Sequence, residues 1–146
     1  MQTQLNGESS SLALYQAWQQ LRKEQAGMRA RDAALALGVS EAELTASSLT
    51  VDSVRLCPDW PVLLPALESL GYVMALTRNE HCVHERKGHY REVTVMPSGL
   101  MGMVVSADID LRLFMAGWDS VFAVEEETPR GTQRSIQIFD QQGTAV

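Results

Sequence analysis

The stretch "DIDLRLFMAGWDSVFAVEEETPRGTQRSIQIFDQQG", residues 108–143, decides the fold class. It consists of short apolar-rich runs that are separated by turn signals such as "AGWD", "TPRG" and "DQQG". Apolar runs broken in this way by glycine, proline and aspartate are typical of strands joined by short turns. The same pattern extends back to Tyr72. The second half of the chain therefore predicts an antiparallel meander.

The first half of the chain has helical patterns instead. Leu14, Trp18 and Leu21 recur at spacings of four and three, which predicts one buried helical stripe beginning near residue 11. The segment "RARDAALALGVSEAELTAS" predicts two further helices around a glycine turn, with Ser40 and Glu43 forming a capping box. Helices first and strands afterwards predict an α+β fold with one large antiparallel sheet.

The ends of the chain differ from its middle. Residues 1–10 are polar and predict a flexible tail, so the domain is expected over residues 11–146. Within it, "DWPVLLPALESLG" predicts a short helix with Asp59 as its cap, which Pro65 either shortens or kinks. After "RSIQIFD" and its turn, the return strand "TAV" is only three residues long. A return strand normally matches its partner, so we expect the domain to be truncated at its C-terminal end.

Composition narrows the classes of function. The 146 residues are 45% hydrophobic and 21% charged, with a formal net charge of −6, which is typical of a globular protein and unfavourable for coating DNA. We recognise no signal peptide and no membrane span. Cys57 and Cys82 form no disulfide framework or zinc knuckle, and are expected to be reduced, buried thiols of a cytoplasmic protein.

All three histidines lie in "TRNEHCVHERKGHYREV", residues 77–93. A tight turn at residues 87 and 88 would give a hairpin with one basic face that has no carboxylate, made of Cys82, His84, Arg86, His89, Arg91 and Val93. This face lacks the converging ligands of a zinc site. It suits an anionic ligand such as the propionates of haem, and ordinary solvated hairpin residues are the alternative.

A single arginine stands out in the strand "DIDLRLFM". Alternation places Leu111 and Leu113 on one face of this strand and Asp110, Arg112 and Phe114 on the other. Arg112 therefore lies between a carboxylate and an aromatic ring. It either forms a structural ion pair with a neighbouring aspartate, or reaches an anion or a metal-bound ligand. The sequence leaves both possibilities open.

Several long strings carry a family resemblance: "ARDAALALGVSEAEL", "LPALESLG", "LTRNEHCVHERKG" and residues 108–143. From about Leu12 onward, the chain resembles the N-terminal half of the cytoplasmic haem-utilisation proteins of the HemS, ChuS and PhuS type, and PhuS-like members most of all. The resemblance implies one copy of a repeat that occurs twice in the family, with haem bound between the two halves. It also implies that the principal axial histidine belongs to the second half.

The resemblance assigns roles to two residues here. Arg112 matches an arginine on the other side of the haem, and His84 matches a first-half histidine considered as an alternative ligand. The implied function is haem trafficking, with delivery of haem to a haem oxygenase as partner. The alternative is a haem-degrading enzyme, in which this fragment alone is expected to be inactive.

A third hypothesis is a DNA-binding module formed by the helical pair at residues 29–47. Its weakness is the acidic segment "SEAELTAS", since DNA-reading helices favour polar and basic residues. Other expected partners are the chain's own C-terminal half and a second copy of the fragment. Such a homodimer would form through an exposed sheet edge.

Overall fold

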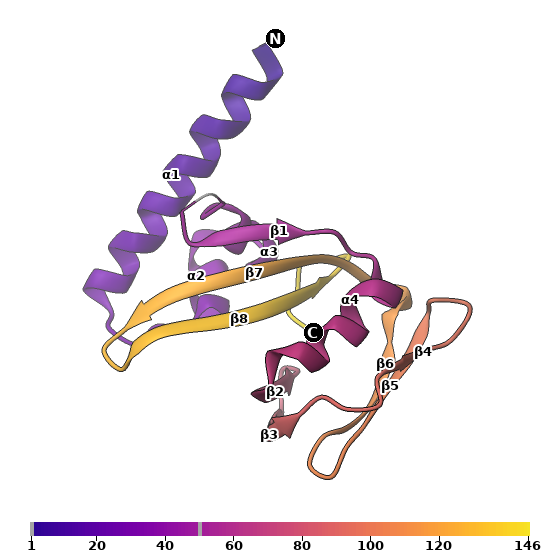
Figure 1. Cartoon of the computed structure of the whole chain (residues 1–146). Coiled ribbons are helices and arrows are strands. Elements are labelled where there is room, and N and C mark those ends of the chain that lie inside the picture. The colour runs from indigo at the N-terminus through magenta and orange to yellow at the C-terminus, as the bar shows by residue number, and fades with distance from the viewer. Residues whose placement is uncertain (1, 50) are drawn as a thin grey trace. The chain divides into compact units, whose positions relative to one another are not determined.

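The computed structural model describes residues 2–49 and 51–146, and side chains from residue 10 onward (Figure 1). The chain divides into two compact units. Unit 1 comprises Met1–Leu56 and Ser120–Ala145, and unit 2 comprises Cys57–Asp119 and Val146. Among the described residues, no helix is sufficiently long and apolar to span a membrane. The predicted α+β class is confirmed, with helices first and antiparallel strand pairs after them.

The helices of unit 1 are α1 (Gln2–Glu24), α2 (Ala30–Leu37) and α3 (Glu41–Ala46). They meet around a buried cluster of Trp18, Ala33, Ala34 and Leu44. Helix α1 begins nine residues earlier than the sequence predicts, because residues 2–10 contain no proline that would stop it. The mobility of residues 1–10 remains a prediction.

The turn between α2 and α3 has the predicted chemistry. Gly38 adopts the left-handed conformation, with φ 69°, that ends α2. Ser40 then caps α3, because its hydroxyl accepts the backbone N–H of Glu43 at 3.1 Å. In return, the Glu43 carboxylate accepts the backbone N–H of Ser40 at 2.8 Å. The capping box is confirmed.

The sheet of unit 1 is formed by β1 (Ser53–Leu56), β7 (Trp118–Thr128) and β8 (Gly131–Asp140), in the order β1-β7-β8. Figure 1 shows β7 and β8 running side by side as a long hairpin. Phe122 and Phe139 pack edge to face in its core, with ring centroids 5.8 Å apart. After β8, the chain turns back and forms one isolated bridge between Phe139 and Ala145.

Unit 2 begins with α4 (Trp60–Ala66) and the 3₁₀ turn η1 (Leu67–Leu70). Asp59 occupies the N-cap position, but its side chain makes no capping hydrogen bond, so that part of the prediction is wrong. Pro61, in the first turn, leaves fewer N–H groups that need a cap. The strands of unit 2 are β2 (Tyr72–Arg78), β3 (Val83–His89), β4 (Thr94–Val95), β5 (Met101–Val105) and β6 (Asp110–Phe114). The 3₁₀ turn η2 (Met115–Gly117) follows β6.

The strands form three sheets rather than the one large sheet predicted, with orders β1-β7-β8, β2-β3 and β4-β5-β6. Two local interruptions account for the division. Glu92 has a φ of 47°, a left-handed conformation that stops the predicted strand over residues 90–96 and leaves only β4. The η2 turn separates β6 from β7 in the same way.

The predicted turn at Lys87 and Gly88 is also wrong. Strand β3 continues through both residues, and the hairpin turn lies at residues 79–82. The side-chain oxygen of Asn79 holds this turn, because it accepts the backbone N–H groups of His81 at 2.8 Å and Cys82 at 2.9 Å. Both cysteines are exposed rather than buried, because Cys82 lies in this turn and Cys57 in the link before α4.

Candidate functional site

The corrected hairpin changes which residues share a face. In the observed register His84 pairs with Thr77, and Arg86 pairs with Ala75. His89 instead pairs with Tyr72 on the opposite face, where the two rings lie 5.5 Å apart. The predicted basic face is therefore wrong in part, since it keeps His84 and Arg86 but loses His89.

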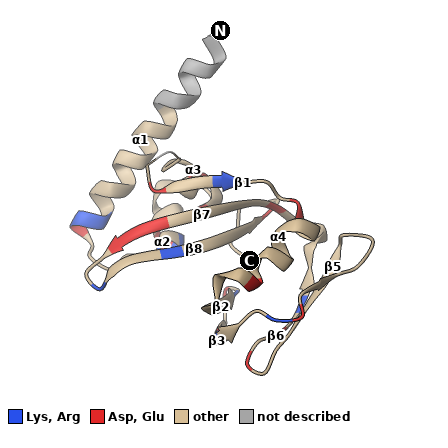
Figure 2. Cartoon of the chain, in the orientation of Figure 1, with Lys and Arg blue, Asp and Glu red and all other residues tan. Residues whose placement is uncertain are grey.

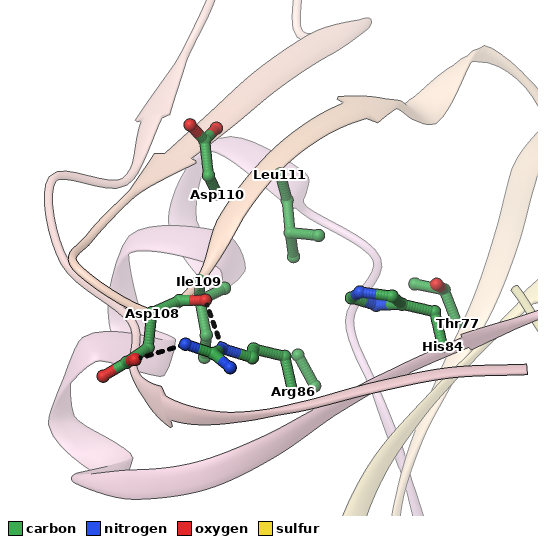
Figure 3. A pocket seen from close by; sticks show the side chains of 8 residues that line it. Thr77, His84, Arg86, Asp108, Ile109, Asp110 and Leu111 are labelled. Carbon is green, nitrogen blue, oxygen red and sulfur yellow. Dashed lines mark hydrogen bonds and ion pairs between the residues drawn. The ribbon is translucent and has the colours of Figure 1, made fainter.

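His84 and Arg86 line an open depression of about 330 Å³ in unit 2. Its other lining residues come from β2 and from the segment that leads into β6: Ala75, Thr77, Asp108, Ile109, Asp110 and Leu111. Figure 3 shows the imidazole of His84 pointing toward Leu111, while Arg86 reaches Asp108. The depression thus holds one imidazole and one guanidinium with the Asp108 carboxylate beside it, whereas the carboxylate of Asp110 pairs with Arg112 instead.

Arg86 is already engaged by the protein. Its Nη2 lies 2.7 Å from Oδ1 of Asp108, and its Nε donates to the backbone oxygen of Asp108 at 3.0 Å. The predicted absence of carboxylates beside Arg86 is therefore wrong, because the segment before β6 places Asp108 against it. The side chain of His84 forms no hydrogen bond within the described part of the chain, so its ring is available to a ligand.

A second candidate surface is the exposed face of the sheet β4-β5-β6. The register aligns Thr94 with Met103 and Met103 with Arg112, and in the next row Met101 lies opposite Phe114. The backbone N–H of Met96 donates to the oxygen of Met101 at 2.8 Å, which extends that row. Cross-strand partners share a face. We call this surface the methionine face: Thr94, Met96, Met101, Met103, Arg112 and Phe114.

The methionine face is apolar and open. Phe114 is 64% exposed, and Met96, Met101 and Met103 are 51%, 46% and 37% exposed. The opposite face of the same sheet is the core side, where Leu111 and Leu113 pack against Val104, Ile109 and Ala75. Tyr90 packs there too, and burial raises the pKa of its phenol. The alternation predicted for the strand "DLRLF" is thus confirmed.

Arg112 is the positive charge of the methionine face. Its Nη1 pairs with the Asp110 carboxylate, and Nη1 also lies 3.4 Å from the backbone oxygen of Leu111. The side chain is nevertheless 54% exposed. The ion pair left open by the sequence is present, and the remaining N–H groups of the guanidinium can still donate to an anion.

The structure separates the two predicted site residues. His84 lines the depression with Leu111, whereas Arg112 lies on the other face of β6 and is not part of that lining. No group of three or more histidine, cysteine, aspartate or glutamate side chains within the described residues could hold a metal ion. The methionines are the residues that sequence reasoning missed. The alternation in "LMGMVVS" was the available signal.

The methionine face fits a flat, apolar, anionic molecule such as haem. Thioethers and an aromatic ring offer an adaptable apolar platform, and a guanidinium beside them recognises a carboxylate. Charge elsewhere is unlike a nucleic-acid surface: acidic side chains gather along the end of β7, and α3 carries no basic residue in its last turn (Figure 2). The helical pair at residues 29–47 thus gains no support as a DNA reader.

Comparison with known proteins agrees with this chemistry. Residues 38–146 match the haemin-degrading HemS/ChuX domain family. The hemin transport protein HmuS of Yersinia pestis is 45% identical over 135 residues, which are 92% of this chain and 39% of that protein. The hemin transport protein HemS of Yersinia enterocolitica is 42% identical over 137 residues, 93% of this chain and 39% of that protein.

Solved structures show the same fold. Holo-PhuS, a haem-binding protein from Pseudomonas aeruginosa, is 68% identical with a TM-score of 0.90, over 93% of this chain and 39% of that one. The haem-degrading enzyme ChuS of Escherichia coli O157:H7 is 39% identical with a TM-score of 0.85. The match covers 93% of this chain and 40% of the ChuS chain. The chain spans about two fifths of the length of these relatives. By its sequence and its fold, this chain belongs to the haemin-degrading HemS/ChuX domain family.

Proposed function

We propose that the chain is the N-terminal half of a cytoplasmic haem-trafficking protein that delivers haem to a haem oxygenase. The observation that carries the proposal is the methionine face, where an exposed arginine lies within an exposed apolar surface. The names of HmuS and PhuS, which describe hemin transport and haem binding, support the same ligand.

Each part of the methionine face has a role in this proposal. Met101, Met103 and Phe114 cover one side of the porphyrin plane and exclude water from it. Arg112 donates to a haem carboxylate or to a ligand on that side of the haem, while Asp110 keeps the guanidinium oriented. The principal iron ligand comes from the part of the relatives that this chain does not cover. His84, on the other side of β6, is a secondary ligand at most.

A hemin titration followed by the Soret band tests the proposal. It compares this chain with a longer version that carries the rest of the relatives' length, each with and without Arg112→Ala. Arg134→Ala is the matched control, because Arg134 is also exposed and paired, with Glu125 at 2.7 Å, but lies in unit 1. Tight, saturable binding is expected in the longer protein, weakened by Arg112→Ala and not by Arg134→Ala. Equal weakening by both would reject a specific role for Arg112.

Degradation of haem is the second candidate, and the similarity to the haem-degrading enzyme ChuS supports it. The longer protein would be loaded with hemin and supplied with ascorbate, with catalase present. Loss of the Soret band together with release of carbon monoxide would establish degradation by the protein. Loss that occurs only when catalase is omitted would instead mean attack by free peroxide.

A further inference from the structure

We propose that Met101 and Met103 form an oxidation site, and that converting their thioethers to sulfoxides in the haem-free protein weakens the binding of haem to the methionine face. This inference rests on the proposed haem-binding role of that face. It adds a modification that turns the same surface from a binding state into a non-binding one.

Exposure separates the methionines of this face from Met115, and Met96, on the same face at 51% exposed, should oxidise together with Met101 and Met103. Met101 and Met103 are 46% and 37% exposed, whereas Met115, in the same unit, is 2% exposed. Thioether oxidation follows accessibility. Met74 is 42% exposed but lies on β2, outside the methionine face. It therefore provides a matched control of equal accessibility.

The chemistry needs only hydrogen peroxide as oxidant. The thioether sulfur attacks one peroxide oxygen and the O–O bond breaks. That oxygen forms the new S–O bond, and the other leaves as water with both protons. The sulfur loses two electrons and the peroxide gains them.

Two consequences of the sulfoxide oppose haem binding. An apolar side chain becomes polar, so covering it with a porphyrin no longer releases water from an apolar surface. In addition, Met103 lies directly opposite Arg112. Direct cross-strand partners have Cβ atoms about 4.5–5.5 Å apart, within reach for a sulfoxide oxygen to accept a hydrogen bond from the guanidinium. That bond competes with the haem carboxylate.

Peroxide treatment with peptide mass mapping tests the site itself. Two samples of the longer protein are treated with peroxide, one free of haem and one loaded with hemin. Catalase ends each reaction. In the haem-free protein we expect oxidation at Met74, Met96, Met101 and Met103 and little at Met115. Hemin should protect Met101 and Met103 but leave Met74 reactive. Equal protection of Met74 would overturn the assignment to the methionine face.

A hemin titration of the longer protein, oxidised while free of haem, tests whether the sulfoxides weaken haem binding. We expect binding at least about fivefold weaker than before peroxide, from the loss of apolar contact, with recovery after a methionine sulfoxide reductase. The ratio of the Kd measured after peroxide to the Kd measured before it should approach one in Met96→Leu/Met101→Leu/Met103→Leu, but stay raised in Met74→Leu. Unchanged binding despite full oxidation at 101 and 103 would refute this proposal alone. If Arg112→Ala also left binding unchanged, the proposed haem face itself would fail.

Discussion

Replacement of Phe114 by alanine should weaken hemin binding without unfolding the protein. Phe114 is 64% exposed on the methionine face and is not among the described residues that pack in the core cluster around Val104 and Ile109. A phenylalanine side chain carries on the order of 200 Å² of surface, so about 130 Å² is accessible here. A flat ligand that covers half of it removes roughly 65 Å² from water, worth about 1.6 kcal/mol. The expected loss of affinity is therefore about tenfold.

The assay is a Soret titration of the longer protein, paired with urea unfolding. Leu35→Ala is the control, because Leu35 is 82% exposed on α2 in unit 1. The unfolding free energy of Phe114→Ala should stay within about 0.5 kcal/mol of the parent, as expected for an exposed position. An affinity within twofold of the parent, or an equal loss in Leu35→Ala, would refute the placement of haem on this face.

Three further predictions concern the fold around the site. Gly88→Ala should lower the unfolding free energy by about 1–3 kcal/mol in urea, because its Cβ would lie 2.8 Å from Cβ of Asp108; Gly117→Ala, with nothing within 4 Å, should not. Asn79→Ala should speed hydrogen exchange at the two amides that Asn79 accepts, measured by NMR; unchanged exchange would contradict its role. Hydrogen bonds from Ser40 lower the pKa of Glu43, so its stabilisation is complete above the ordinary carboxyl pKa and lost as pH falls through the lowered value. Urea unfolding against pH should therefore show the advantage of the parent over Glu43→Gln disappearing in acid, and a constant difference would exclude this coupling.

Local patterns predicted much of the fold because local chemistry determines them. The capping box needs only Ser40 and Glu43 three residues apart, and the structure contains it. The alternation of Leu111 and Leu113 against Arg112 needs only the strand period, and it is also present. Both features depend only on residues that lie within a few positions of each other in the sequence.

Gly88 shows where the same reasoning fails. A lysine–glycine pair between apolar runs is a common turn signal, yet Gly88 lies buried within a regular strand. The glycine is needed there because Asp108 approaches so closely that a side chain would collide with it. That approach is a contact between residues twenty apart, so no local pattern contains it. The local alternation in "LMGMVVS" puts Met101 and Met103 on one face, but their neighbours on the methionine face follow only from the register of β4, β5 and β6.

The division of the chain has a consequence for the order of its folding. Unit 1 takes its strands from both ends of the sequence, since β1 lies before residue 57 and β7 pairs with it after residue 119. Unit 2, which carries the methionine face, is almost wholly continuous. During synthesis, residues 57–119 leave the ribosome while the helices of unit 1 still lack their sheet. The sheet that carries the methionine face should therefore form first, and α1, α2 and α3 can complete their unit only after β7 and β8 have been synthesised.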